Sequence, residues 1–203
     1  FAAGSTPFTD VKSTAWYADA VSYAYENGLI SGYPDGTFQP ETPLTRAMFA
    51  TILWRMVGSP ETGSADFSDV APNRYYAKPA AWAQSQGIIA GYPDGTFRPD
   101  EPIQRQQVTT ILYRYACSEG ISGTDMFPDM VSSYTDAGKI NKYAKDAMNW
   151  AVRTGLLTGK KKKSEIRTAP SLKLKTGLPH REYLTFGIAR SSTGNLHAIL
   201  PIR

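Results

Sequence analysis

Side chains that could carry out catalysis are scarce in this chain. His180 and His197 are the only histidines, and both lie near the C-terminus, so the rest of the chain lacks the commonest general base. Cys117 is the only cysteine, which excludes an internal disulfide framework and a multi-cysteine zinc site. Asp35 and Glu41 lie on one short loop, whereas glycoside hydrolysis needs two carboxylates that flank the substrate. We therefore expect no enzyme activity, no metal and no cofactor.

The sequence repeats a turn that is followed by an arginine. GYPDGTFQPETPLTRAMF occupies positions 32–49, and GYPDGTFRPDEPIQRQQV returns 59 residues later at 91–108. Tyr-Pro-Asp-Gly predicts a turn, because Pro presets φ, Asp bonds its own backbone and Gly accepts a positive φ. Phe38 and Phe97 follow the two turns and are expected to pack into the core.

Three repeats can be recognised, and the last is incomplete. Each opens with a similar phrase, FTDV, FSDV or FPDM, followed by an aromatic and alanine-rich segment with the spacing of an amphipathic helix. A second helix is expected to start at Thr45 in the first repeat and at Gln104 in the second. The boundaries are 8–57 for repeat 1, 67–116 for repeat 2 and 127–160 for the partial repeat 3. Because about 50 residues make a small core, we expect the repeats to pack together as an all-α, pseudo-threefold bundle of helix–loop–helix units.

The two ends of the chain do not follow the repeat. Residues 1–7 are interpreted as the remnant of a leader peptide, with an ordinary terminus as the alternative. Residues 161–203 are expected to form an irregular or disordered basic tail. Between Lys160 and Arg203 there are ten Lys/Arg and two Asp/Glu, whereas the remainder has 12 and 16, so the repeats are mildly acidic. The basic pI is therefore no argument for nucleic-acid binding, and no apolar run approaches the roughly 20 residues of a membrane span.

The tail also permits a frame-shift interpretation. Codons can be chosen for Ser171–His180 that, shifted by two bases, read Pro-Glu-Thr-Glu-Asn-Arg-Thr-Ala-Thr, similar to the segment around Pro40-Glu41-Thr42 and the following Thr-Arg-Ala. The run of four lysines before it has A-rich codons, at which reading frames slip. The hypothesis is that residues from about 160 onward are a frame-shift product; sequencing the gene tests it.

Phe-x-Asp-Val, Trp-Tyr-Ala, Gly-Leu-Ile-x-Gly-Tyr-Pro-Asp-Gly-Thr-Phe-x-Pro and Thr-Arg-Ala, in that order, resemble the S-layer homology (SLH) family over roughly residues 8–160. The resemblance implies a three-pronged helical bundle that anchors an exported protein to the bacterial cell wall without a covalent bond. It implies as ligand a secondary cell-wall polysaccharide that carries a pyruvylated amino sugar, bound between neighbouring repeats. It also implies a secreted location at the cell wall or surface layer, with other surface-layer proteins as further partners.

The resemblance points to a set of ligand-binding residues. Arg46 and Arg105 match the arginine of the family's Thr-Arg-Ala-Glu motif, where a helix N-terminus and a guanidinium are expected to meet the pyruvate carboxylate. The remaining candidates are a motif hydroxyl, the polar turn residues and aromatic rings that could stack on a sugar: Thr45, Asp35, Gly36, Asp94, Gly95, Tyr33, Tyr92 and Trp16.

Each candidate has a structural alternative. The arginines could be ion-pair partners, the aspartates could serve the turn alone, and the aromatic rings could belong to the core. The family's glutamate is Met48 in repeat 1 and Gln107 in repeat 2, and its threonine is Gln104 in repeat 2, which puts the second site in doubt. The alternative function is a structural surface-layer subunit that self-assembles without binding a specific glycan.

Overall fold

The computed structural model describes residues 6–120, 129–157, 188–190 and 196–198. The chain divides into two compact units, which separate between Ile103 and Gln104. The first unit holds repeat 1 and most of repeat 2. The second unit holds the last helix of repeat 2, the partial repeat 3 and the two short strands near the C-terminus.

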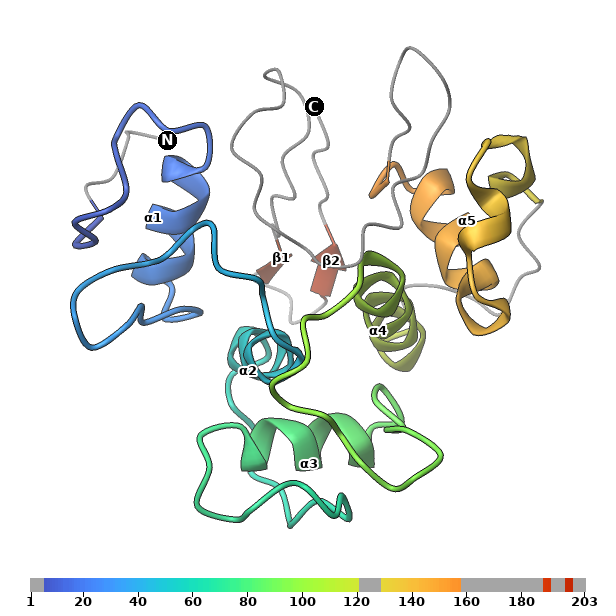
Figure 1. Ribbon diagram of the computed structural model, residues 1–203, viewed down its shortest axis with the longest axis horizontal. Coiled ribbons are helices and arrows are strands. Elements are labelled where there is room, and N and C mark those ends of the chain that lie inside the picture. Colours follow the sequence, from blue (N-terminus) through green and yellow to red (C-terminus); the bar gives the residue numbers. More distant parts are fainter. Residues whose placement is uncertain (1–5, 121–128, 158–187, 191–195, 199–203) are drawn as a thin grey trace. The chain divides into compact units, whose positions relative to one another are not determined.

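The regular secondary structure of the described residues is mainly helical, as the periodicity predicts (Figure 1). The first unit contains α1 (Ala18–Glu26), α2 (Arg46–Met56) and α3 (Ala77–Ser85). The second contains α4 (Arg105–Ser118), the single-turn helices η1 (Val131–Ser133), η2 (Ala137–Lys139) and η3 (Lys142–Ala144), and α5 (Lys145–Arg153). The pseudo-threefold arrangement of the repeats remains a prediction.

The tail departs from the expectation of an irregular segment at two places. Strand β1 (Ile188–Arg190) pairs antiparallel with strand β2 (Leu196–Ala198), so the chain is not helical throughout. Three segments lie outside the described residues: 1–5 of the leader remnant 1–7, 121–128, which includes part of the linker before repeat 3, and the remainder of 158–203, which includes Ser171–His180 of the frame-shift hypothesis.

The repeated turn packs against the first residues of its own repeat. Gly32 and Gly91 have φ of +69° and +75°, and a Cβ on either would lie 2.2 and 2.5 Å from the rings of Phe8 and Phe67. Two constraints therefore favour glycine at both positions: the positive φ of the backbone and the close approach of an aromatic ring. This explains why the residue before Tyr-Pro-Asp-Gly is the same in both repeats.

The aspartate of the Phe-x-Asp segment at the start of each repeat accepts hydrogen bonds from the residues that follow the turn. The Asp69 carboxylate accepts hydrogen bonds from the N–H groups of Phe97 and Arg98, both at 2.7 Å. Asp10 does the same for Phe38 at 2.8 Å and Gln39 at 2.7 Å. Gln39 and Arg98 have φ of +56° and +57°, a conformation that costs an ordinary residue about 1–2 kcal/mol. The two charge-assisted bonds offset that cost.

The helices pack in pairs that cross the repeat boundaries. Helix α2 of repeat 1 packs on α3 of repeat 2, and α4 of repeat 2 packs on α5 of repeat 3 (Figure 1). In the second pair, the rings of Tyr113 and Trp150 lie 5.6 Å apart between centroids. Within the first unit, α1 does not pack on α2 or α3 in this way among the described residues. Helix α1 instead packs on its own repeat, around the buried side chains of Phe8, Tyr17 and Val21.

Candidate functional site

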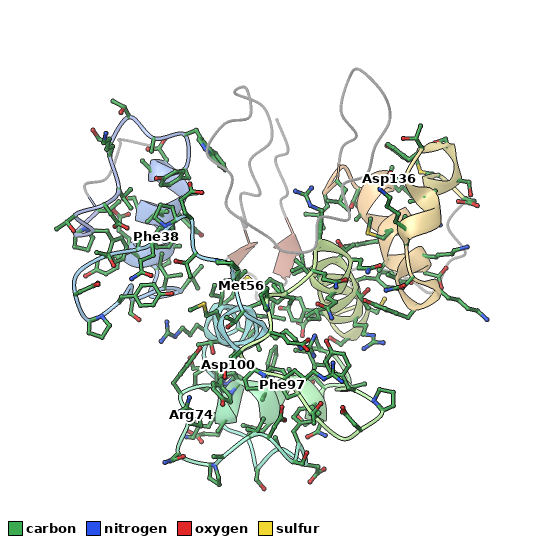
Figure 2. The ribbon with its side chains drawn as sticks, viewed as in Figure 1. Phe38, Met56, Arg74, Phe97, Asp100 and Asp136 are labelled. Atoms are coloured by element: carbon green, nitrogen blue, oxygen red, sulfur yellow. The ribbon has the colours of Figure 1, made fainter. Side chains whose placement is uncertain are left out.

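Arg46, the strongest candidate from the sequence, is the first residue of α2 and only 6% exposed. Its Nε–H donates to the Phe97 carbonyl at 2.8 Å. The guanidinium carbon lies 5.0 Å from the centroid of the Tyr92 ring and 5.2 Å from that of Phe97. Because arginine stays protonated in proteins, this contact sets a fixed positive charge against the loop of the next repeat. Phe97 is labelled beside the α2–α3 pair in Figure 2.

The N-terminus of α2 does not offer the free donors that we expected for an anion. The N–H of Arg46 donates to the Glu101 carbonyl and that of Ala47 to the Pro99 carbonyl, both at 3.0 Å. The Thr45 hydroxyl accepts from the N–H of Met48 at 3.2 Å. The loop of repeat 2 and the cap residue thus use the first three donors of the helix. The expectation of a helix N-terminus open to a carboxylate is therefore wrong at this position.

Tyr92 also belongs to a cluster of charged residues within its own loop. The guanidinium carbon of Arg98 lies 3.9 Å from the centroid of the Tyr92 ring. Arg98 also pairs with Asp94 at 2.9 Å and Glu101 at 3.2 Å, and the Tyr92 hydroxyl donates to Glu101 at 3.1 Å. Tyr92 therefore lies near two guanidinium groups, one buried and one half-buried. Repeat 1 has Gln39 at the position of Arg98 and cannot build this cluster.

The turn aspartates are engaged within their own turns. The carboxylate of Asp35 accepts from the N–H and hydroxyl of Thr37, at 3.0 and 2.6 Å, and Asp94 accepts from Thr96 at the same distances. Bonding to the Thr96 hydroxyl, with a further contribution from Arg98, lowers the pKa of Asp94 to about 2. The Thr37 contacts likewise lower the pKa of Asp35. Gly36 and Gly95 complete the turns and have their carbonyls bonded to the N–H of Thr9 and Ser68.

Tyr75 is a residue of this region that the sequence did not single out. It is 60% exposed, and its hydroxyl lies near the side chain of Thr45. In the repeat alignment Tyr75 stands where repeat 1 has Trp16, which was named as a candidate. Trp16 is half-buried and packs edge-on against Tyr17, with 5.5 Å between ring centroids. The alignment was a usable signal for Tyr75, because a candidate in one repeat implies its counterpart in the next.

Arg105 starts α4 and belongs to the second unit. Gln104 and Gln107 cap this helix reciprocally, and the Gln104 N–H donates to the Gln107 side chain at 2.9 Å. The neighbouring Gln106 is buried and accepts a hydrogen bond from the N–H of Asn141 at 3.0 Å. The loop that would correspond to 91–103 in repeat 3 lies outside the described residues. In the first unit, by contrast, Arg46 contacts Tyr92 and Phe97, and Tyr75 lies near Thr45, the residue before Arg46. We call Thr45, Arg46, Tyr75, Tyr92 and Phe97 the Arg46 junction.

The described residues include no group of three or more His, Cys, Asp or Glu side chains able to hold a metal ion. None of their helices is long and apolar enough to cross a membrane. The Arg46 junction offers a cation, hydroxyls and aromatic rings. Such a set suits a ligand with a carboxylate and an apolar ring face.

Comparison with known proteins identifies the family. The model of the S-layer homology domain matches residues 7–50, 66–109 and 133–164. The chain belongs to the S-layer homology domain family. The third match ends earlier in its repeat than the first two, which agrees with an incomplete third SLH repeat.

Proteins of the bacterial cell surface share this SLH sequence. The chain is 34% identical over 157 residues to "Cell surface glycoprotein 1" of Acetivibrio thermocellus, an alignment that covers 71% of this chain and 7% of the relative. It is 36% identical over 123 residues to the "Cellulosome-anchoring protein" of the same organism, an alignment that covers 54% of this chain and 26% of the relative. It is 28% identical over 161 residues to an "S-layer protein" of Bacillus licheniformis, an alignment that covers 78% of this chain and 18% of the relative. The SLH chain thus spans about a quarter or less of each of these relatives, and it belongs with exported proteins of the cell surface.

Proposed function

We propose that this SLH chain anchors a protein to the bacterial cell wall without a covalent bond, by binding a secondary cell-wall polysaccharide that carries a pyruvylated amino sugar. The Arg46 junction supports this proposal most directly. There a buried guanidinium is fixed by the Phe97 carbonyl and two rings, close to an exposed tyrosine and a threonine. Anchoring, and not catalysis, is the role that this set of side chains can perform.

The guanidinium supplies the contact with the pyruvate carboxylate. A charge-assisted bond of arginine to a carboxylate is roughly twice as strong as a neutral hydrogen bond, and more so away from water. Arg46 is held in place before any ligand arrives, so little side-chain entropy is lost on binding. The mild acidity of the repeats disfavours general attraction to an anionic polymer, which makes a local contact of this kind necessary.

The aromatic residues supply the contact with the sugar ring. The exposed ring of Tyr75, which lies near Thr45, offers an apolar face for a pyranose. Tyr33 and Tyr92 remain candidates for the same role. Asp35, Gly36, Asp94 and Gly95 are proposed to act through the shape of the turn, since the aspartate oxygens are already engaged there.

Two further parts of the SLH assignment are proposals. The pairing of α2 with α3 and of α4 with α5 supports a pseudo-threefold plan, in which each second helix packs on the next repeat. Arg105 occupies the motif position in repeat 2 and would serve a second site of the same kind. The chemistry there differs, because glutamines replace the cap threonine and the family's glutamate.

A pull-down on purified cell walls, with and without chemical removal of the pyruvate, tests the proposal. We expect binding to native walls and its loss after depyruvylation. Tyr75→Ala should weaken wall binding about tenfold, equal to about 1.4 kcal/mol, while leaving the fold intact because the side chain is exposed. Tyr25→Ala, which removes an exposed ring from α1, is the matched control. Unchanged binding to depyruvylated walls would count against the ligand, and unchanged binding of Tyr75→Ala would count against the site.

A further inference from the structure

Arg46 and Asp69 bond to opposite ends of one peptide group. The Nε–H of Arg46 donates to the Phe97 carbonyl at 2.8 Å. That carbonyl belongs to the peptide that joins Phe97 to Arg98, and the N–H of the same peptide donates to the Asp69 carboxylate at 2.7 Å. Because the peptide is trans and planar, its C=O and N–H point in opposite directions. The guanidinium and the carboxylate therefore bind the two ends of this peptide.

The two charges match the dipole of the peptide. Each peptide unit carries a dipole of about 3.5 D, which is positive at the N–H and negative at the C=O. The anionic carboxylate of Asp69 meets the positive end, and the cationic guanidinium of Arg46 meets the negative end. Hydrogen bonds in such a chain polarise one another, by roughly 10–30% per bond, and are stronger away from water. The bond that holds the buried Arg46 is thus strengthened by a carboxylate on the far side of the peptide.

Asp69 also fixes the orientation of this peptide. Its second oxygen accepts the N–H of Phe97 at 2.7 Å, so the two carboxylate oxygens hold two consecutive N–H groups. Arg98 has a φ of +57°, which is strained for a residue with a side chain. This φ sets the plane of the Phe97–Arg98 peptide and thereby directs the carbonyl towards Arg46. Relaxation of Arg98 to a negative φ would turn the carbonyl away.

The same segment of repeat 2 supports the ring of Phe97. Phe67, two residues before Asp69, stacks on Phe97 with 5.4 Å between ring centroids and 26° between ring planes. The guanidinium carbon of Arg46 lies 5.2 Å from the centroid of the Phe97 ring. Phe97 thus contacts Arg46 through its carbonyl and through its ring. The Phe-x-Asp segment supports both parts, with Asp69 at the backbone and Phe67 at the ring.

We propose that Asp69 is a positioning residue for Arg46, which acts through the Phe97–Arg98 peptide and raises the affinity of the Arg46 junction for an acidic sugar. The effect on affinity rests on the proposed function, in which Arg46 meets the pyruvate carboxylate. A guanidinium that is already held in place loses less side-chain freedom when the ligand binds. Asp69 itself does not contact the sugar in this proposal, so its contribution is made through Arg46.

Repeat 1 supplies a matched control. Asp10 accepts the N–H groups of Phe38 and Gln39 at 2.8 and 2.7 Å, and Gln39 has a φ of +56°. Asp10→Asn and Asp69→Asn therefore remove one acceptor oxygen from the same local structure, and we expect them to lower stability equally. The Nε–H of Arg46 bonds to the loop that Asp69 holds, so only Asp69→Asn should affect it.

Solvent exchange of the Arg46 Nε–H, followed by NMR in the full chain, measures this bond. Asp69→Asn should speed the exchange about tenfold, whereas Asp10→Asn should leave it within about twofold of the unaltered chain. Calorimetric titration with the methyl glycoside of a pyruvylated amino sugar should show about tenfold weaker binding for Asp69→Asn, or about 1.4 kcal/mol. Asp69→Glu keeps the charge but places it one methylene further from Cα, and it should speed the exchange about threefold. This variant replaces Asp69→Asn if the latter does not fold.

Other outcomes would overturn the proposal. Equal acceleration of the exchange in the two asparagine variants would mean that Asp69 acts through stability alone. Unchanged Arg46 exchange in Asp69→Asn, or in Asp69→Glu where it is used instead, would contradict the proposal even if sugar binding weakens. If the unaltered chain does not bind the sugar while the exchange pattern holds, the proposed function fails and the positioning of Arg46 stands.

Discussion

Two glycines of repeat 2, one after α3 and one before the repeated turn, allow the energetic role of glycine at these positions to be measured. Gly87 and Gly91 have φ of +66° and +75°, so alanine is unfavourable at both. A Cβ at Gly87 would meet no atom within 4 Å, whereas one at Gly91 would lie 2.5 Å from Phe67 Cε1 and 2.9 Å from the Thr96 carbonyl. The pair therefore separates the cost of a left-handed backbone from the cost of a close approach.

We expect Gly87→Ala to lower the free energy of unfolding by about 1–2 kcal/mol, the cost of the left-handed conformation alone. Gly91→Ala adds overpacking against a ring and a carbonyl, worth about 1–3 kcal/mol, for a total of about 2–5 kcal/mol. Urea unfolding followed by tryptophan fluorescence measures both values under the same conditions.

A double-mutant cycle identifies the contact responsible. Phe67→Leu removes the ring atoms nearest to the added methyl group, so it should recover about 1–2 kcal/mol when combined with Gly91→Ala. Combined with Gly87→Ala, it should show no coupling. Equal losses for the two glycine variants, or equal coupling in the two cycles, would refute the idea that the Phe67 ring dictates glycine at this position.

Three further predictions concern the loops. Asp69→Ala should lower the free energy of unfolding by about 3 kcal/mol in urea titrations, because two backbone N–H groups lose a charged acceptor. Asp69→Asn keeps one acceptor oxygen and should lower the free energy of unfolding by about half as much. Gln39→Gly should raise the free energy of unfolding by up to about 1 kcal/mol in the same titrations, because glycine adopts the φ of +56° without strain. A loss of stability would show that the side-chain contacts of Gln39 outweigh the backbone strain. The Asp94 pKa of about 2 lies below the ordinary 3.8, so the stability that this carboxylate contributes is fully present above pH 4 and is lost as pH falls towards 2. NMR titration of the Asp94 carboxyl should give this midpoint, and a midpoint near 3.8 would contradict it.

Local chemistry explains what the sequence predicted well. The Tyr-Pro-Asp-Gly turn depends on residues that are neighbours in the chain, and the structure confirms the turn bonds of Asp35 and Asp94. The burial of Phe97 and the start of α2 after Thr45 also follow from local spacing. These features require no knowledge of what the repeat packs against.

The missed features depend on contacts between distant segments or lie outside the repeats. Arg46 is buried because Phe97, 51 positions later, supplies its acceptor, and the donors of α2 are used by Pro99 and Glu101. No periodicity in residues 32–49 carries that information. The pairing of β1 with β2 lies in a part of the sequence without the repeat, where no pattern was available to predict it.

The helix pairs have a consequence for how the protein can be divided. The segment that recurs in the sequence begins at the Phe-x-Asp phrase, but the helices that bury each other, α2 with α3 and α4 with α5, come from opposite sides of the boundary between repeats. Cutting the chain at the linker 58–66 would separate α2 from α3 and expose the apolar surfaces of both. The boundaries of the sequence repeat and those of the packed helix pairs therefore differ by about half a repeat. A fragment that starts at α2 and ends after the loop of repeat 2 is the piece expected to fold alone, although no single repeat in the sequence has those boundaries.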